Sequence, residues 1–449
     1  MELAEKLRGA LGNVRVISGG DISLDFCRDE YPGKAFKPEA VIEARGIEDI
    51  RAAVKACAEL GIPLTVRGAG TGQAGGSVPV KGGAVLSIKG MDAVLEIDEA
   101  AKTARVQAGV LLQTLKAEAS KRGLYYPPDP GEETSTIGGN AATNAGGPCA
   151  LKYGKTQDYI LDAVLVLVNG ETVSLTELED PSSIPGSEGT LAVIAELTLR
   201  LIEKPAADIY LLLPFSSNKD AFDAAEIILR EDYSPAMLEY MDTDLIEFSG
   251  HVTGEPVFPA EIDGERPACS IMLKIEGGSD DEIEEKLEQF AEFSEGLGCM
   301  DILVGDTPAM KRDFMTAYRA FHLSAERGAQ TSFEINVDVP TGSIGALLEY
   351  AKEIGGENGF RVMANAHLGS GGTHIFFLSD RERGELAEQI DAVRDGVYRR
   401  CLALGGTAAG EYGVGYTKSS YLSEEQRRRF SALKRRFDPA GILNPGKIV

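Results

Sequence analysis

Four glycine-bearing segments in the first half of the sequence constrain the fold more than any other feature. They read RGAGTGQAGGSVP, TIGGNAATNAGG, KYGKTQDY and GSEGTL, at residues 67–79, 136–147, 152–159 and 186–191. Glycine leaves backbone N–H groups unshielded, and successive N–H groups can form an anion-binding concavity. One such cluster alone is typical of a flexible surface loop. Four clusters favour a shared nucleotide-type ligand whose pyrophosphate is held by main-chain donors.

Two familiar phosphate-binding motifs occur in the wrong context. Residues 70–75 match the dinucleotide fingerprint Gly-x-Gly-x-x-Gly, which requires a helix to follow. The next residues, SVPVKGGAVLSI, are β-like and are interrupted by Pro79. Residues 154–156 read Gly-Lys-Thr, but Cys149 stands where a P-loop needs its first glycine. Neither a Rossmann domain nor a nucleotide triphosphatase is indicated.

The charge and cysteine content exclude several classes of protein. The chain has 45 Lys+Arg against 70 Asp+Glu, a formal net charge of -25, which repels phosphate backbones and excludes nucleic acid as a partner. Six cysteines occur without a CxxC pair, which argues against an iron–sulfur cluster or a disulfide scaffold. No apolar run reaches the roughly 18–20 residues of a membrane span, and the opening residues lack a signal-peptide pattern. We therefore expect a cytoplasmic protein with no integral membrane segment.

Periodicity divides the chain into three regions and predicts an α+β protein. Residues 1–205 mix helix and sheet with glycine-rich loops: residues 47–60 have helical spacing, and alternating valines before Asn169-Gly170 indicate a hairpin. Residues 206–406 alternate strands with amphipathic helices, which predicts a largely antiparallel sheet covered by helices. Residues 407–449 hold a glycine-rich turn, a helix and a closing Asn-Pro-Gly-Lys.

The glycine segments and the neighbouring YYPPDPGEETSTIGGN resemble the FAD-binding domain of the vanillyl-alcohol oxidase type. Within that group the sequence resembles above all the glycolate oxidase/D-lactate dehydrogenase family of FAD-linked 2-hydroxy-acid dehydrogenases. The ending FDPAGILNPGKI, residues 437–448, is similar to that family's ending, and matching segments begin near residue 37. The resemblance implies a two-subdomain FAD-binding domain (1–205), a substrate or cap domain (206–406), and a C-terminal segment (407–449) that returns to the FAD-binding domain.

The resemblance also implies which residues contact FAD. The positions that match the family's FAD-binding residues are Arg67, Gly68, Ala69, Gly70, Thr71, Gly72, Gly75, Gly76, Ser77, Pro128, Asp129, Thr136, Ile137, Gly138, Gly139, Asn140, Asn144, Gly146, Gly147, Tyr153, Gly154, Thr156, Glu188, Gly189, Leu191, Ile194 and Asn444. Some relatives attach the flavin to a histidine in the first glycine loop or to a later cysteine. The loop at 67–79 has no histidine, and the setting of Cys149 does not match those cysteines. The expected cofactor is therefore non-covalent FAD.

Two of the four histidines lie in one short segment, NAHLGSGGTH, between strand-like residues. The pattern predicts a hairpin with His367 and His374 at facing strand ends. Such imidazoles either share a divalent metal with a carboxylate as third ligand or form ordinary hydrogen bonds at a turn. The family's metal-binding motifs match His367, His374 and Glu411, so the resemblance implies zinc, manganese or iron at these residues.

One short stretch and two single positions depart from the family's pattern. The stretch is Gly371-Gly372-Thr373, which replaces a Gly-Asn stretch. Ser370 replaces an aspartate in the histidine segment, and Tyr412 replaces the histidine that serves the family as general base after Glu411. An ordinary phenol, with a pKa near about 10, is a weak base at neutral pH, so Tyr412 is either the base or a hydrogen-bonding group. Arg319 matches the arginine that holds the substrate carboxylate, a task for which a planar two-pronged donor is suited. The candidate catalytic residues are Tyr412, Arg319 and His367.

The resemblance implies oxidation of a small D-2-hydroxy acid, such as D-lactate or glycolate, by hydride transfer to flavin N5. Glu334 stands where some members have a lysine for a second carboxylate, which favours a monocarboxylate substrate. Electrons would pass to an electron-transferring flavoprotein, an iron–sulfur subunit or a quinone. Ser370 and Tyr412 support an alternative, a catalytically altered FAD-binding subunit of a larger redox complex. A non-redox transferase resembling alkylglycerone-phosphate synthase ranks below both, because its cluster of adjacent histidines is missing.

Overall fold

The computed structural model describes residues 3–231 and 234–448, which form two compact units. Unit 1 comprises Met1–Gly146, Gly154–Lys204 and Glu411–Val449, and unit 2 comprises Gly147–Tyr153 and Pro205–Gly410. The chain thus changes unit at Pro205 and Glu411, where the sequence suggested 206 and 407. Residues 147–153, which we expected in the FAD-binding domain, group with unit 2.

The first sheet of unit 1 leads directly into the first glycine loop. Its strands lie in the order β1-β2-β4-β3, with β1 antiparallel to β2 and the other pairs parallel. Helix α2 has the bounds that its spacing predicts, and it ends at Gly61, which adopts a φ of 64°. The element bounds are α1 Leu3–Leu11, β1 Arg15–Ser18, β2 Ala40–Glu43, α2 Ile47–Leu60, β3 Leu64–Arg67 and β4 Ala84–Ser87.

The second sheet of unit 1 is antiparallel, in the order β5-β6-β10-β8-β9. Strands β8 and β9 pair Val166 with Thr172, which confirms the hairpin predicted at Asn169-Gly170. A short pair, β7 and β11, lies apart from this sheet. The bounds are β5 Val94–Asp98, β6 Thr103–Gln107, α3 Leu112–Ser120, β7 Leu124–Tyr125, β8 Ile160–Val166, β9 Thr172–Ser174, β10 Val193–Arg200, β11 Ile202–Glu203 and α12 Glu424–Phe437.

Most of the second glycine segment forms a short helix, α4 (Ile137–Thr143). Thr136 caps it by accepting a hydrogen bond from the N–H of Gly139 at 3.2 Å. Gly138 is needed for packing, because an added Cβ there would lie 2.6 Å from the Cβ of Ala108. Glycine in this segment therefore reflects close packing as well as exposure of the backbone.

The C-terminal segment is bound to the strand that carries the first glycine loop. Leu443 forms an isolated parallel bridge with Leu64, and the N–H of Asn444 donates to the carbonyl of Leu64 at 2.7 Å. Lys434, in α12, donates to the carbonyl of Thr190 at 2.8 Å, which ties the same segment to the loop before β10. The C-terminal segment thus contacts both the strand before the first glycine loop and the loop before β10.

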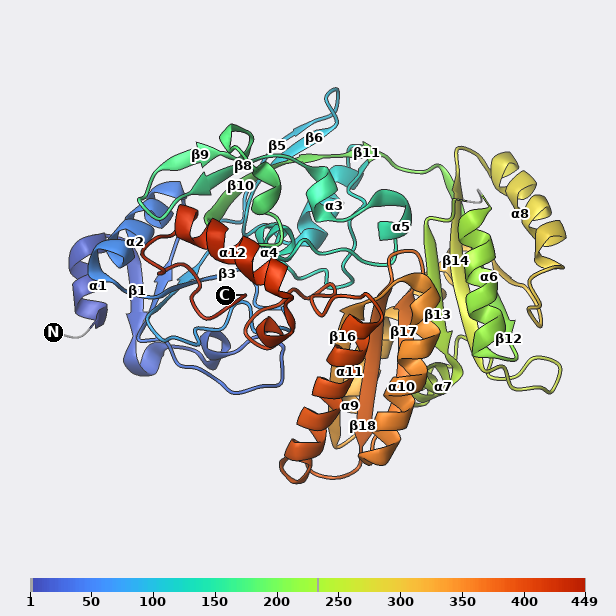
Figure 1. The fold of residues 1–449 in the computed structure, drawn as a ribbon. Helices are drawn as coiled ribbons and strands as arrows, with labels where there is room; N and C mark the ends of the chain where they lie inside the picture. Colours follow the sequence, from blue (N-terminus) through green and yellow to red (C-terminus); the bar gives the residue numbers. More distant parts are fainter. Residues whose placement is uncertain (1–2, 232–233, 449) are drawn as a thin grey trace. The chain divides into compact units, whose positions relative to one another are not determined.

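Unit 2 is built on one seven-stranded antiparallel sheet, in the order β15-β12-β14-β13-β17-β18-β16 (Figure 1). This confirms the predicted antiparallel sheet with helices. Its strands are β12 Ala207–Phe215, β13 Met237–Asp242, β14 Cys269–Gly277, β15 Leu303–Gly305, β16 Thr331–Asp338, β17 Arg361–His367 and β18 Gly372–Ser379. Its helices are α5 Ala150–Tyr153, α6 Asn218–Arg230, α7 Thr243–Thr253, α8 Asp280–Ser294, α9 Pro308–Arg327, α10 Ile344–Glu357 and α11 Ala387–Ala403.

Helices cover both faces of this sheet. Neighbouring residues on a strand point to opposite faces, so Val362 and Met363 mark the two sides. Met363 packs in a buried cluster with Phe314 and Phe321 of α9. On the other side, Gly355 of α10 approaches Val362 so closely that an added Cβ would lie 2.3 Å from it. Helices α10 and α11 lie side by side over strands β16 to β18 (Figure 1).

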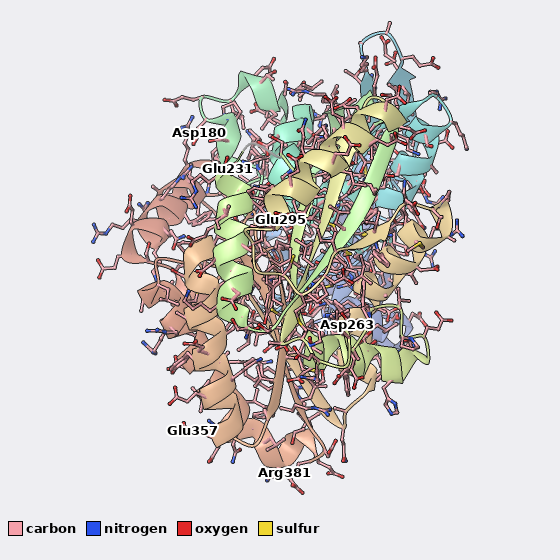
Figure 2. All side chains as sticks on the ribbon, turned by 90° about the vertical axis from the view of Figure 1, so that its right-hand side faces the viewer. Asp180, Glu231, Asp263, Glu295, Glu357 and Arg381 are labelled. Atoms are coloured by element: carbon pink, nitrogen blue, oxygen red, sulfur yellow. The ribbon has the colours of Figure 1, made fainter. Side chains whose placement is uncertain are left out.

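The surface of unit 2 is acidic, in agreement with the net charge of -25. Glu231, Asp263, Glu295 and Glu357 are exposed, and Figure 2 shows them at the ends of helices and in loops. Within residues 3–231 and 234–448, no helix combines the length and the apolar character that crossing a bilayer requires.

Candidate functional site

Unit 1 contains a pocket bounded by the loops that the sequence singled out. Its wall comes mainly from the loop after β3, from residues 130–145, from the turn before β10 and from the first residues of the C-terminal segment. The lining residues are Val66, Gly68, Ala69, Gly70, Thr71, Gly72, Gly76, Ser77, Ile88, Pro130, Glu132, Ser135, Thr136, Gly138, Gly139, Asn140, Ala142, Thr143, Ala145, Glu188, Gly189, Ala192, Ile194, Glu411 and Tyr412. Segments far apart in the sequence therefore share one cavity.

The pocket wall includes many but not all of the residues expected to contact FAD. Those in the wall are Gly68, Ala69, Gly70, Thr71, Gly72, Gly76, Ser77, Thr136, Gly138, Gly139, Asn140, Glu188, Gly189 and Ile194. Those outside it are Arg67, Gly75, Pro128, Asp129, Ile137, Asn144, Gly146, Gly154, Thr156, Leu191 and Asn444 in unit 1, and Gly147 and Tyr153 in unit 2. The sequence missed wall residues such as Val66, Pro130 and Ala192, because ordinary apolar side chains carry no motif.

Gly72 is a wall residue that neither its backbone conformation nor packing within unit 1 requires to be glycine. Its φ is outside the left-handed region, so the backbone does not require glycine. An added Cβ would meet nothing nearer than Oδ2 of Asp29 at 3.9 Å. Packing therefore does not require glycine either. A glycine that neither backbone nor packing demands, in a cavity wall, fits a bound group that approaches the main chain closely.

Gly70 has the opposite reason to be glycine. Its φ is +84°, and an added Cβ would lie 1.9 Å from Nη2 of Arg67. That guanidinium is buried beneath the loop, where Nη1 donates to the carbonyl of Arg28 at 2.8 Å and to Oγ of Ser77 at 3.1 Å. Arg67, which we expected to contact the cofactor, thus holds the shape of the loop and does not line the pocket.

Glu188 and Asn444 fasten the loops around the pocket. The buried carboxylate of Glu188 accepts hydrogen bonds from the N–H groups of Val414 at 2.6 Å and Gly415 at 2.8 Å. Burial raises the pKa of Glu188, although these two hydrogen bonds oppose the rise. The amide of Asn444 donates to the carbonyls of Glu188 at 2.6 Å and Gly76 at 2.8 Å. One asparagine therefore joins two glycine loops to the C-terminal segment.

The composition of the wall fits a flavin nucleotide. Among the described residues that line the pocket, none is lysine, arginine or histidine, so a pyrophosphate there would be met by main-chain and hydroxyl donors. Apolar side chains such as Val66, Ile88 and Ile194 suit a flat ring system. The wall also lacks cysteine among those residues, and Cys149 instead packs against the core of unit 2.

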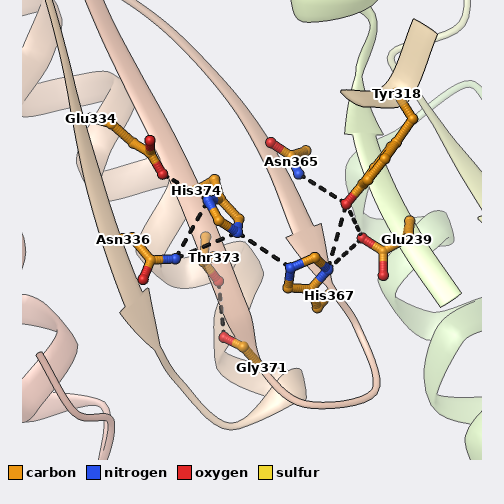
Figure 3. A network of polar contacts seen from close by, with 9 residues as sticks. All are labelled: Glu239, Tyr318, Glu334, Asn336, Asn365, His367, Gly371, Thr373 and His374. Carbon is orange, nitrogen blue, oxygen red and sulfur yellow. Dashed lines mark hydrogen bonds and ion pairs between the residues drawn. The ribbon is translucent and has the colours of Figure 1, made fainter. Parts of the chain in front are cut away.

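In unit 2, polar side chains from β13, β16, β17 and β18 gather on one face of the sheet (Figure 3). Strand register places Glu239 beside His367, and His374 between Asn336 and Asn365. The hairpin between β17 and β18 carries both histidines, as predicted. These residues lie on the same face of the sheet as the apolar cluster that packs on α9. The polar group therefore borders a buried core and does not belong to a solvated surface.

Each histidine in this group has a buried carboxylate at Nδ1. Oε2 of Glu239 lies 2.6 Å from Nδ1 of His367, and Oε1 of Glu334 lies 2.7 Å from Nδ1 of His374. The hydroxyl of Tyr318 donates to Oε2 of Glu239. The two Nε2 atoms face each other at 3.3 Å, with the rings nearly perpendicular at 85° (Figure 3).

Glu334 engages a third histidine. Its Oε2 lies 2.8 Å from Nδ1 of His322. Burial disfavours ionisation of Glu334, but the hydrogen bonds from His322 and His374 outweigh it and hold the pKa of this carboxyl well below its ordinary value. For His322, burial lowers the pKa, and the hydrogen bond with Glu334 reverses the effect and raises it. Both oxygens of Glu334 thus contact imidazoles. The sequence had indicated only that Glu334 disfavours a second carboxylate on the substrate.

The histidine pair fits one divalent metal. Two nitrogens bound to one tetrahedral zinc ion at about 2.0–2.1 Å lie about 3.4 Å apart, close to the 3.3 Å between the Nε2 atoms. The third expected ligand, Glu411, belongs to unit 1 and directly follows Gly410, the last residue of unit 2. Gly410 packs against Asn336, where an added Cβ would lie 2.0 Å from Oδ1. The three-residue metal site stays a prediction.

The other expected catalytic residues lie in different surroundings. Arg319 is exposed on α9, next to Tyr318. Tyr412 lines the pocket of unit 1, and the ammonium of Lys418 lies 5.9 Å from its ring centre. Ser370, the other departure from the family's pattern, lies in the turn between β17 and β18. The next residue must be glycine, because Gly371 has a φ of +81° and an added Cβ would lie 1.9 Å from the carbonyl of Val339.

Comparisons with known proteins agree with this geometry. The family model for FAD binding domains matches residues 38–176, and that for C-terminal domains of FAD-linked oxidases matches residues 204–448. A D-lactate dehydrogenase of Anaerostipes hadrus is 38% identical, covering 100% of this chain and 97% of the relative. The glycolate oxidase subunit GlcD of Bacillus subtilis is 30% identical, covering 95% and 92%. A D-lactate dehydrogenase of Archaeoglobus fulgidus is 34% identical, covering 91% of each chain.

Solved structures give the fold. p-Cresol methylhydroxylase with substrate bound has a TM-score of 0.81 at 18% identity, covering 99% of this chain and 96% of that one. Alkyldihydroxyacetonephosphate synthase has a TM-score of 0.78 at 19% identity, covering 99% and 84%. At such identities the likeness concerns the fold alone. The predicted α+β fold of the vanillyl-alcohol oxidase type is confirmed.

Proposed function

Because this chain belongs to the FAD-linked oxidase family, we propose that it oxidises a small D-2-hydroxy acid, such as D-lactate or glycolate, to the 2-oxo acid. The observation that carries the proposal is similarity over nearly the whole chain to relatives named D-lactate dehydrogenase and glycolate oxidase subunit. FAD, when bound in unit 1, would supply the hydride acceptor of the reaction. The pocket of unit 1 supports non-covalent FAD, because its described wall offers neither histidine nor cysteine.

We assign substrate binding to the histidine site and to Arg319. His367, His374 and Glu411 would hold zinc, manganese or iron, a metal that supplies polarisation of the substrate's hydroxyl and carboxylate oxygens when bound. Arg319 would hold the carboxylate by a bidentate pair. Two observations support this assignment. The two Nε2 atoms lie 3.3 Å apart, and Glu411 is joined by a peptide bond to Gly410, the last residue of unit 2.

We propose that the side-chain oxygen of Tyr412 accepts the proton of the substrate hydroxyl. This residue lines the pocket that would hold the flavin, and it follows the proposed ligand Glu411. Tyr412 would act as a phenolate, its own proton having first been released to solvent, and would accept the hydroxyl proton while hydride leaves the neighbouring carbon. The reduced flavin would then pass its electrons to an electron-transferring flavoprotein, an iron–sulfur subunit or a quinone.

An anaerobic half-reaction tests the proposal. The purified FAD-loaded protein is mixed with D- and L-lactate, glycolate and longer 2-hydroxy acids, and flavin absorbance near about 450 nm is followed. We expect rapid bleaching by a small D-2-hydroxy acid and much slower bleaching by its L-isomer. Retention of FAD without bleaching by any acid would contradict the proposal. It would instead favour a catalytically altered FAD-binding subunit, the alternative that Tyr412 and Ser370 support.

A further inference from the structure

We propose that Glu239 and Glu334 are positioning residues that keep the ring protons of His367 and His374 on Nδ1. Both Nε2 atoms then offer lone pairs to one divalent cation. The proposal deepens the proposed function, because it rests on the metal site assigned there to the same histidines. It adds two carboxylates on two further strands, and it makes a statement about ring protons that can be measured without any metal.

Glu239 is placed to fix the proton of His367. It lies on β13, directly opposite His367 in the register of β13 and β17, and its side chain is 0% exposed. The distance from Oε2 to Nδ1 is 2.6 Å, and the hydroxyl of Tyr318 donates to the same oxygen. Because Oε2 already accepts from this hydroxyl, it acts as an acceptor toward the ring as well, and Nδ1 of His367 carries the proton.

Glu334 does the same for His374 from the opposite edge of the hairpin. It lies on β16, and its Oε1 is 2.7 Å from Nδ1 of His374. Its other oxygen is 2.8 Å from Nδ1 of His322, so two imidazoles orient one carboxylate. The amide of Asn336 lies 3.4 Å from both ring nitrogens of His374, which is too long to decide where the proton sits.

With both protons on Nδ1, the facing Nε2 atoms carry lone pairs (Figure 3). Neither can donate to the other, so their 3.3 Å approach is not a hydrogen bond between neutral rings. A cation that both lone pairs bind removes this repulsion, and metal-bound histidines ordinarily give the other ring N–H to a carboxylate. The same arrangement here involves two histidines and two carboxylates on four strands.

A buried carboxylate elsewhere in unit 2 provides the contrast and the control. Glu276, on β14, has a side chain that is 1% exposed, and it pairs with Lys152 at 2.9 Å and Lys274 at 2.6 Å. Glu276 therefore forms ion pairs with lysines and contacts neither His367 nor His374 among its described hydrogen bonds. Burial alone does not distinguish Glu239 and Glu334; their imidazole partners do.

The first test reads the ring protons directly. The sequence has only four histidines, so the FAD-loaded full chain labelled with 15N-histidine gives few signals. His251→Gln and His322→Gln identify the other two. After chelator treatment, we expect His367 and His374 to show a protonated Nδ1 and an unprotonated Nε2. A proton on Nε2 of either ring would overturn the proposal.

The second test measures Zn²⁺ affinity by calorimetry on the same metal-free, FAD-loaded protein. Glu239→Gln and Glu334→Gln should each raise the Kd about 10–100-fold, the usual effect of losing a carboxylate behind a histidine ligand. Glu276→Gln should leave the Kd unchanged, and His367→Ala measures background binding to thiols. No specific Zn²⁺ binding by the unaltered protein, or equal weakening in Glu276→Gln, would overturn the proposal. Failure of every hydroxy acid to bleach the flavin would reject the proposed function and leave both of these readouts intact.

Discussion

The two units of this protein make their sites in opposite ways. The pocket of unit 1 is lined largely by glycine, alanine and backbone. At Gly72, neither the backbone nor the neighbouring protein atoms require glycine. The site of unit 2 is made of ionisable side chains, His367 and His374, each held by a buried carboxylate. A cofactor that stays bound needs a close fit to the main chain, whereas reacting groups need side chains with defined protons.

This difference separates two kinds of failure. Substitutions in the wall of unit 1 should remove the flavin and with it all activity. Substitutions in the polar group of unit 2 should leave a yellow protein that reacts slowly. Single substitutions in each unit can test that separation.

Gly72→Leu should abolish FAD binding without lowering the folding stability of the flavin-free protein. The added side chain would meet no protein atom nearer than 3.9 Å at its Cβ, so it would extend into space that the flavin nucleotide requires. Gly70→Leu should also lose FAD, but it should in addition lower the stability of the flavin-free protein by about 1–2 kcal/mol, because its φ is +84°. The measurements are the flavin-to-protein absorbance ratio and the melting temperature of the flavin-free protein.

The matched control for these two variants is Gly20→Leu. Gly20 is exposed, its φ is outside the left-handed region, and an added Cβ would meet nothing within 4 Å. This variant should keep both FAD and stability. If Gly72→Leu bound FAD normally, the claim that a ligand excludes its side chain would be wrong.

The pocket of unit 1 was the part of the molecule that the sequence predicted best. Glycine spacing marks places where a side chain is absent, and this pattern can be read without knowledge of the fold. The helix at residues 47–60 and the hairpin at Asn169-Gly170 were predictable for the same local reason, namely periodicity and turn chemistry. Spacing could not separate a glycine that faces the pocket without packing on the protein, such as Gly72, from one that packs closely, such as Gly138.

The site of unit 2 was predictable only in its histidines. Glu239 and Tyr318 come from β13 and α9, and only the strand register brings Glu239 opposite His367. Register depends on the whole sheet and leaves no local motif. One signal was available: a charged residue in the otherwise apolar MLEYM run is costly to bury unless it has a partner. That signal indicates a buried polar network but does not name the partner.

His374→Ala should slow bleaching of the flavin by the substrate about 10³-fold while FAD content stays unchanged, because the lost interaction lies in unit 2 and stabilises charge on the substrate. His251→Ala is the matched control, since His251 is exposed on α7. It should bleach at the unaltered rate. The anaerobic bleaching rate and the flavin absorbance ratio together give the answer. Loss of FAD in His374→Ala would contradict the claim that substitutions in unit 2 leave FAD binding unchanged.

Tyr412→Phe should lower the bleaching rate about 100-fold, the low end of what a positioned general base contributes. It is the exception within unit 1, because Tyr412 lines the pocket and yet is proposed to act on the substrate. The aromatic ring remains, so FAD content should not change. A bleaching rate within about threefold of the unaltered protein would leave the phenol only a hydrogen-bonding role.

Asp29→Asn should change stability alone and leave FAD content and the bleaching rate as they are, because this buried carboxyl lies outside the wall of the pocket. Burial raises the pKa of Asp29 to about 7, and Oδ2 has no hydrogen-bond partner among the described residues. Between about pH 4 and pH 7 the folded protein therefore keeps a proton that the unfolded chain has released, and folding stability falls by at most about 1.4 kcal/mol per pH unit as the pH rises. Asparagine cannot ionise, so the flavin-free variant should gain stability over the unaltered protein across this window and hold a constant advantage above it. Melting temperatures at pH 5 and pH 8 measure the gain, and an equal difference at both values would show that Asp29 is already ionised in the folded protein at pH 5.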